Sequence, residues 1–191
     1  GDFIRGNVDE TFSTIRNGAQ NQASTADATW QLARISTSGI TNQYANVHRA
    51  AFPFDTSSLG AGAILGSAEF FIWGTDKIDS LSITPTLVLD FTTALAYEIS
   101  NYAGVRQATA DITYANFNTT GYNSFTLNST GLNNINKTGT TRFSLRIGND
   151  FDNIAPSWSA NLYSQFMGSF SETAGTSQDP KLVITYTLPT S

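Results

Sequence analysis

The feature that most constrains the fold is a two-residue alternation of apolar side chains, which recurs between clusters of turn-forming residues. Successive side chains of a β-strand point to opposite faces, so this alternation predicts strands. In residues 48–54, Pro53 cannot donate a ladder hydrogen bond and predicts an edge or a strand end. The even-numbered residues of this segment lie on the other face: His48, Ala50, Phe52 and Phe54.

The segment Ala68–Gly74 is apolar on both parities. Phe70 and Ile72 belong to one face, and Phe71 and Trp73 belong to the other. A strand with two apolar faces is typical of the middle of a sheet. We therefore expect a central strand here, with Phe70, Phe71 and Trp73 in the core together with Trp30 of another strand.

In the segment Arg142–Ile147, apolar residues alternate with Ser144 and Arg146, which predicts one dry and one wet face. Leu132 and Ile135 lie three apart and favour one short helical turn. Further strands are expected at Thr29–Ile35, Pro85–Phe91, Asn123–Asn128 and Leu182–Leu188.

These patterns predict an all-β fold, an antiparallel β-sandwich of jelly-roll type with at most one or two short helical turns. The 191 residues suit one sandwich, and no repeat or linker divides them. We expect a single domain over residues 1–191.

Composition limits the partners. The chain has a formal net charge of -5 and only 10 Lys and Arg, well spread, which disfavours nucleic acid as a partner. No apolar run approaches the ~20 residues of a membrane span, so we expect no membrane insertion. Ser, Thr and Asn are abundant, and charged residues are 13%. Such a surface suits an extracellular setting, although Thr in strands and Ser or Asn in turns explain the same composition.

Several segments carry a resemblance to a known family: Arg49–Leu59, Ala68–Trp73 and Asp179–Tyr186, with Thr11–Gly18 and Thr120–Leu127 fitting the same layout. Together they resemble the DNRLRE-type jelly-roll modules, which are similar to carbohydrate-binding modules and recur in secreted bacterial proteins and in phage or environmental surface proteins. The resemblance implies a fold more than a function, because these segments are strands and turns rather than a ligand site.

The residues needed for common catalytic sites are scarce. The sequence has one histidine, His48, which we expect to be structural because it shares a strand face with Phe52. No GxSxG, GxxxxGK[ST] or HExxH motif occurs. Glu69 has the strand parity of Phe71, and we expect a solvent-facing or arginine-paired carboxylate there rather than a glycosidase acid. We therefore expect no enzyme.

An acidic segment predicts a metal site. Asn149, Asp150, Asp152 and Asn153 fall within one short stretch, and their oxygens suit calcium. The modules that the chain resembles often hold a structural calcium ion. An ordinary turn is the alternative, because Asp and Asn also dominate turns.

Sugars stack on flat aromatic rings while their hydroxyls meet amides. Trp158, Asn161 and Tyr163 lie in a segment without a clean strand period, and they predict a glycan-binding platform. The alternative is that Trp158 caps one end of the core.

These observations lead us to expect a non-catalytic extracellular structural or adhesive module, a subunit or domain of a virion (capsid decoration or tail fibre) or of a cell-surface assembly. Its partners would be copies of itself, other surface or virion proteins, or glycans. The alternative is a carbohydrate-binding module of a secreted protein.

Overall fold

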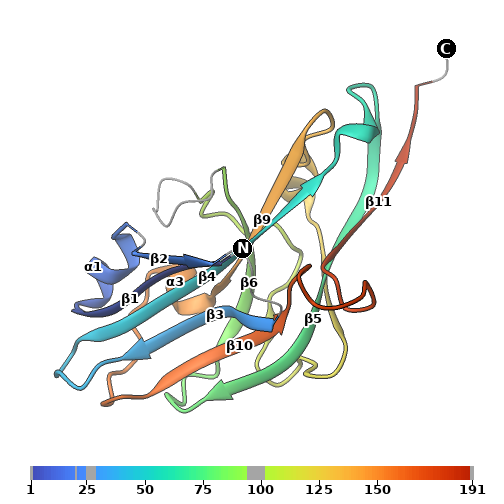
Figure 1. Ribbon diagram of the computed structural model, residues 1–191. Helices are drawn as coiled ribbons and strands as arrows, with labels where there is room; N and C mark the ends of the chain where they lie inside the picture. Colours follow the sequence, from blue (N-terminus) through green and yellow to red (C-terminus); the bar gives the residue numbers. More distant parts are fainter. Residues whose placement is uncertain (1, 20, 25–28, 94–101, 190–191) are drawn as a thin grey trace.

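The computed structural model describes residues 2–19, 21–24, 29–93 and 102–189 (Figure 1). All paired strands in this part of the chain run antiparallel. The strands are β1 (Asp2–Glu10), β2 (Gln22–Ser24), β3 (Thr29–Thr37), β4 (Tyr44–Asp55), β5 (Ile64–Asp79), β6 (Thr86–Phe91), β7 (Ile112–Thr113), β8 (Tyr122–Thr126), β9 (Thr140–Ile147), β10 (Tyr163–Ser169) and β11 (Lys181–Thr187). The helices are α1 (Phe12–Asn17), η1 (Ser57–Leu59), α2 (Ser129–Asn133) and α3 (Gly148–Asp152).

The sheet order is β11-β5-β10-β3-β4-β9-β6-β7, with β1 joining β2 to β4 and β8 lying against β5. The all-β, antiparallel, sandwich-like fold class is confirmed. The helical turn expected near Leu132 is α2, but α1, α3 and η1 are additional, so the expected number of helical turns was too small. Sequence alternation found β3, β4, β5, β6, β8, β9 and β11, and it missed β10, β1 and the short strands β2 and β7.

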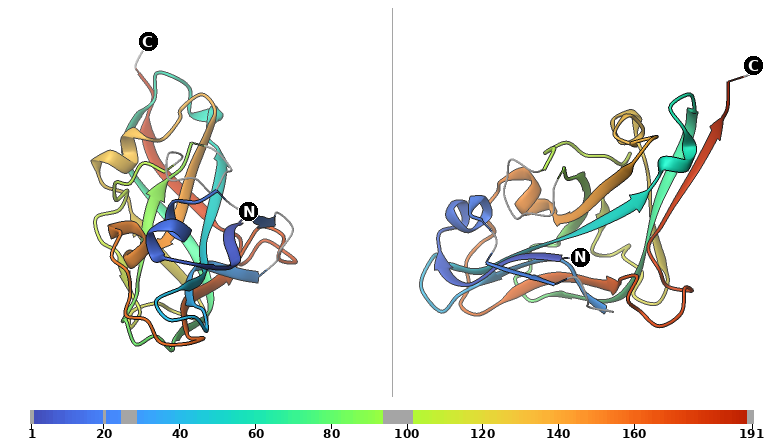
Figure 2. Two further views of the ribbon diagram at one scale, coloured as in Figure 1. Left: turned by 90° about the vertical axis from the view of Figure 1, so that its left-hand side faces the viewer. Right: turned by 45° about the horizontal axis from the view of Figure 1, so that its top comes forward.

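Two long strands change partners along their length, which folds the sheet over on itself (Figure 2). The Ile64–Trp73 part of β5 pairs with β11 and β8, whereas residues 74–79 pair with β10. The change occurs at Gly74, where a Cβ atom would collide with the carbonyl oxygen of Asn118. Strand β4 likewise pairs with β1 and β3 in its first half and with β9 from Ala50 onward.

The space between the two layers is filled largely by aromatic rings. Phe70 of β5 is completely buried, and its ring centroid lies 5.3 Å from that of Phe52 and 6.1 Å from those of Phe125 and Phe143. The face of β4 that alternation assigned to the core therefore does contain a core residue, Phe52. His48 is buried as expected, and its Nδ1 lies 2.9 Å from Oε1 of Gln31.

The other face of β4, β9 and β6 is covered by the helices α1 and α3, which lie on the same side of the sheet (Figure 2). This cover contradicts one expectation. Ser144 and Arg146 of β9 were assigned to a wet face, but both are buried. No helix in the described part of the chain has the length and apolar character to cross a membrane.

Candidate functional site

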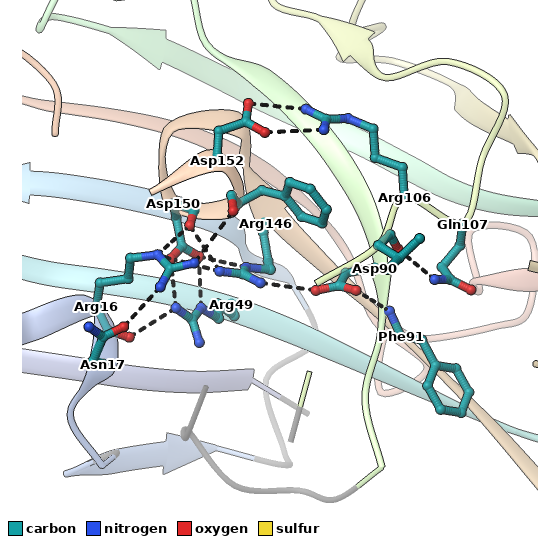
Figure 3. Close-up of polar contacts among 12 residues, drawn as sticks. Arg16, Asn17, Arg49, Asp90, Phe91, Arg106, Gln107, Arg146, Asp150 and Asp152 are labelled. Atoms are coloured by element: carbon teal, nitrogen blue, oxygen red, sulfur yellow. Dashed lines mark hydrogen bonds and ion pairs between the residues drawn. The ribbon is translucent and has the colours of Figure 1, made fainter. Parts of the chain in front are cut away.

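The four residues expected to bind calcium lie in α3 and at its end, directly after β9. Asp150 is buried at 1% exposure, whereas the Asp152 side chain is 40% exposed. The two carboxylates turn to different arginines (Figure 3). The structure therefore does not gather Asn149, Asp150, Asp152 and Asn153 around one point.

Asp150 is the centre of a buried ion-pair network. Arg49 donates to its Oδ2 from Nε at 2.7 Å and to its Oδ1 from Nη2 at 2.6 Å. Arg146 donates to the same two oxygens from Nε at 2.9 Å and from Nη2 at 3.1 Å. Each oxygen of Asp150 thus accepts two charge-assisted hydrogen bonds, and both arginine side chains are at most 1% exposed.

Three further residues extend the network. The Nη1 of Arg146 donates to Oδ2 of Asp90 in β6 at 2.9 Å. The Nε of Arg16 in α1 donates to the backbone oxygen of Asp150 at 2.6 Å. The Tyr102 ring lies against the guanidinium carbons of Arg49 at 4.7 Å and Arg146 at 5.3 Å. The network thereby joins α1, α3, β4, β9 and β6.

The two buried carboxyl groups respond differently to this environment. Burial alone would raise the pKa of Asp150, but the charges and hydrogen bonds of Arg146 and Arg49 hold it well below its usual range. Burial raises the pKa of Asp90, and the charge of Arg146 offsets this only partly. Asp150 is therefore the firmly ionised member, which suits a structural anchor for α3.

The other predicted calcium ligands also have protein partners. Arg106 donates from Nη1 and Nη2 to the two oxygens of Asp152, both at 3.1 Å. The Asn149 side chain donates to the backbone oxygen of Ile154 at 3.2 Å. Asn153 ends α3 in the left-handed region with φ 57°. These contacts build and anchor the turn around α3, and a cation at Asp150 would have to displace two guanidinium groups.

The three residues of the expected glycan platform have different surroundings. Tyr163 begins β10, and the Arg34 guanidinium carbon lies 4.2 Å from its ring centroid, so one face of the ring is covered. Trp158 is half-buried, and its Nε1 is buried without a hydrogen-bond partner. Asn161 is exposed in the left-handed region, and its backbone N–H donates to the Ser38 oxygen at 3.3 Å. The segment therefore wraps the end of β3.

Sequence reasoning missed an aromatic surface on the solvent side of β5 and β8. Phe71 and Trp73 were expected in the core, but they are half-buried on the face opposite Phe70. Their ring centroids lie 6.2 Å and 5.2 Å from that of Tyr122, both edge-on. Lys181 of β11 places its Nζ 3.9 Å from the Tyr122 centroid. We call Phe71, Trp73, Tyr122 and Lys181 the aromatic face. Trp30, also expected in the core, is 36% exposed on β3.

A shallow pocket of about 250 Å³ adjoins the aromatic face at Tyr122. Its walls carry amide, hydroxyl and carboxylate groups from Asn116, Asn118, Ser124 and Asp111. Asp111 also accepts hydrogen bonds from Arg106 Nε at 2.9 Å and 3.1 Å. An aromatic surface beside several amides has the chemistry that a neutral sugar requires.

A second exposed surface lies at one end of the sheet. Strand β11 is the last strand in the sheet order, and in the described residues it pairs only with β5 (Figure 1). Four of the eight exposed large hydrophobic residues of the described chain lie on it or beside it: Ile64 (63%), Val183 (53%), Tyr186 (42%) and Leu188 (65%). We call β11 with Ile64 and Leu188 the β11 edge.

The β11 edge continues into a groove of mixed polarity, which Ser129, Asn133 and Lys137 also line. A cavity of about 440 Å³ lies between the start of β5 and α2, with Ile64, Leu65, Leu132 and Ile135 among its lining residues. Lys137 at its rim donates to the backbone oxygen of Ala63 at 2.9 Å. Of the apolar residues that line the groove, Ile64 is exposed, whereas Leu65 and Leu132 pack against the core and Ile135 is buried.

Comparisons with known proteins do not add to this description. The sequence matches no model of a known protein family. No curated protein matches it either.

Proposed function

We propose that this chain is a non-catalytic structural and adhesive module that works outside the cytoplasm, as a subunit or domain of a virion or cell-surface assembly. The observation that carries the proposal is the β11 edge. An unpaired strand edge offers a row of backbone donors and acceptors to another chain, and proteins usually block such edges with charges, prolines or covering loops. Along β11 the one charged residue is Lys181.

The distribution of potential catalytic groups supports a non-catalytic role. His48, the one histidine in the sequence, is 1% exposed and bonded to Gln31. Asp150 and Asp90, the most deeply buried carboxylates of the network, accept hydrogen bonds from arginines. Paired groups of this kind hold elements together and do not exchange protons with a substrate.

The proposal is tested by measuring whether the β11 edge accepts a strand. We would add a synthetic peptide with the sequence of residues 180–188 to the protein and follow amide hydrogen exchange. We expect slower exchange in β11 and no change in β3, which already has partners on both sides. Equal exchange in β11 with and without a large excess of peptide would reject an assembly role for this edge.

Glycan binding is the second candidate function, and the aromatic face is the observation that favours it. On a flat sheet surface, half-exposed rings beside a polar pocket can stack on sugar rings while Asn116 and Ser124 bond to hydroxyls. Two platforms then compete, the aromatic face and the segment around Trp158.

Single alanine variants on a glycan array discriminate between the platforms. We expect Trp73→Ala to abolish retention of any glycan that the wild type binds, and Trp158→Ala to retain it. Loss with Trp158→Ala alone would move the site to the segment first expected from the sequence. Both variants need wild-type melting temperatures for the comparison, and the absence of any bound glycan rejects the candidate.

A further inference from the structure

We propose that the partner of the β11 edge is a second copy of this chain, bound in an antiparallel, two-fold arrangement of β11 against β11. The inference rests on the proposed assembly function and specifies its partner. Such pairing joins the sheets of two copies into one continuous sheet, with the same surface used on both sides.

Charge favours a second copy at this position. The chain has a net charge of -5, so two copies repel each other over most orientations. Residues 56–68, which include the start of β5, contain no charged residue, and β11 and Leu188 add only Lys181. One acidic residue does lie beside β11: Glu69 of β5 is opposite Val183 and accepts a hydrogen bond from Thr126. Contact through the β11 edge therefore brings together a part of the molecule that has few charged groups.

The position of Lys181 selects the strand direction. Two-fold antiparallel pairing centred on Ile184 lets all seven residues of β11 pair, with Lys181 opposite Thr187 and Val183 opposite Thr185. A parallel, in-register pairing would place each Lys181 beside its counterpart, and like charges on neighbouring strands are destabilising. Antiparallel pairing places the two lysines at opposite ends of the interface.

Side-chain burial supports the same interface. Val183 and Thr185 are exposed and adjacent to each other across the proposed two-fold axis, while Leu182 and Ile184 already pack against the core. Ile64, Tyr186 and Leu188 lie near the end of the strand and become partly covered when a second copy extends the sheet. A single pair of strand edges buries a small area, so we expect a concentration-dependent dimer rather than an obligate one.

The first test is sedimentation or light scattering over a range of protein concentrations. We expect wild-type dimerisation, and we expect Val183→Lys to weaken it about tenfold or more because it places charges at the interface. Ile154→Lys is the matched control: Ile154 is 60% exposed and lies after α3, and its substitution adds the same charge. Equal melting temperatures of the two variants show that both fold.

The second test determines the register of the two β11 strands by cysteine cross-linking. Introduced cysteines report on it specifically, because the sequence has no cysteine of its own. We expect Val183→Cys and Thr185→Cys variants to cross-link efficiently through a short thiol-specific reagent when mixed, and poorly when each is treated alone. Efficient cross-linking of Val183→Cys with itself overturns the proposed register.

The outcomes separate the inference from the function on which it rests. A chain that stays monomeric at high concentration while its β11 amides are still protected by the peptide of residues 180–188 overturns the second copy as partner and leaves the assembly function standing. A monomeric chain without protection by the peptide overturns both.

Discussion

The substitution Asp150→Asn tests the buried network most directly. It keeps the size of the side chain and removes the charge that balances Arg49 and Arg146. The carboxylate accepts four hydrogen bonds from these two guanidinium groups. An asparagine has one acceptor oxygen, and its amide nitrogen would face two of the four donors.

The size of the effect follows from burial. Removing one partner of a buried pair costs about 3–5 kcal/mol, because the remaining charges are left uncompensated. We expect a loss of that size in the free energy of unfolding, and a fall in melting temperature of roughly 6–20 °C for a chain of this length. The control is Asp152→Asn, whose pair with Arg106 is exposed and is worth about 1 kcal/mol or less.

Urea unfolding, followed by tryptophan fluorescence, gives the free energy of unfolding of both variants. An unchanged slope of this free energy against urea concentration shows that only stability has changed. The reasoning is refuted if Asp150→Asn loses no more stability than Asp152→Asn.

The dependence of stability on pH provides a second test. In the unfolded chain Asp150 titrates near its ordinary pKa of about 3.9, and in the folded chain its pKa lies well below that value. Between these values the unfolded chain binds more protons, so the stability due to Asp150 is present above about pH 5 and is lost as the pH falls through the folded pKa. We expect the difference between wild type and Asp150→Asn to shrink from about pH 5 toward pH 2.

Two further predictions concern calcium and the bend in β5. Because guanidinium groups occupy both oxygens of Asp150 and of Asp152, we expect neither calcium nor EDTA to change the melting temperature; a rise with calcium would restore a metal site at residues 149–153. We expect Gly74→Ala to destabilise the fold by about 1–3 kcal/mol, because its Cβ would collide with the Asn118 backbone. The control Gly66→Ala meets only an ordinary contact of 3.5 Å, and equal stability of the two variants in urea would contradict the role given to Gly74.

The sequence predicted strands well because alternation is a local property. It assigned Phe70 to the core correctly, because Ala68 and Ile72 lie on the same strand face and are also apolar. It could not tell what covers the second face of a strand. Phe71 and Trp73 lie on an apolar strand face, yet among the described residues no second layer covers that face, and both side chains remain half-buried.

The same limit explains the error at β9. Arg146 was placed on a wet face because arginine is seldom buried, but α3 and α1 cover that face and supply the partners. One local signal was present: Asp150 follows Arg146 by four residues, at the point where the strand ends. The contribution of Arg49 comes from 101 residues away and has no local signal. Strand β10 was missed for a related reason, because its buried Ser164 and Gln165 break the apolar alternation.

The change of partners along β5 has a consequence for how the protein unfolds. One continuous strand holds β11 and β8 at one end and β10 at the other, so neither layer of the sandwich can separate while the other stays intact. The aromatic core around Phe70 and the sheet beyond Gly74 should therefore lose their structure in one step. Strand β11 is the exception, because it is attached along a single side and can detach while the remaining strands keep their partners.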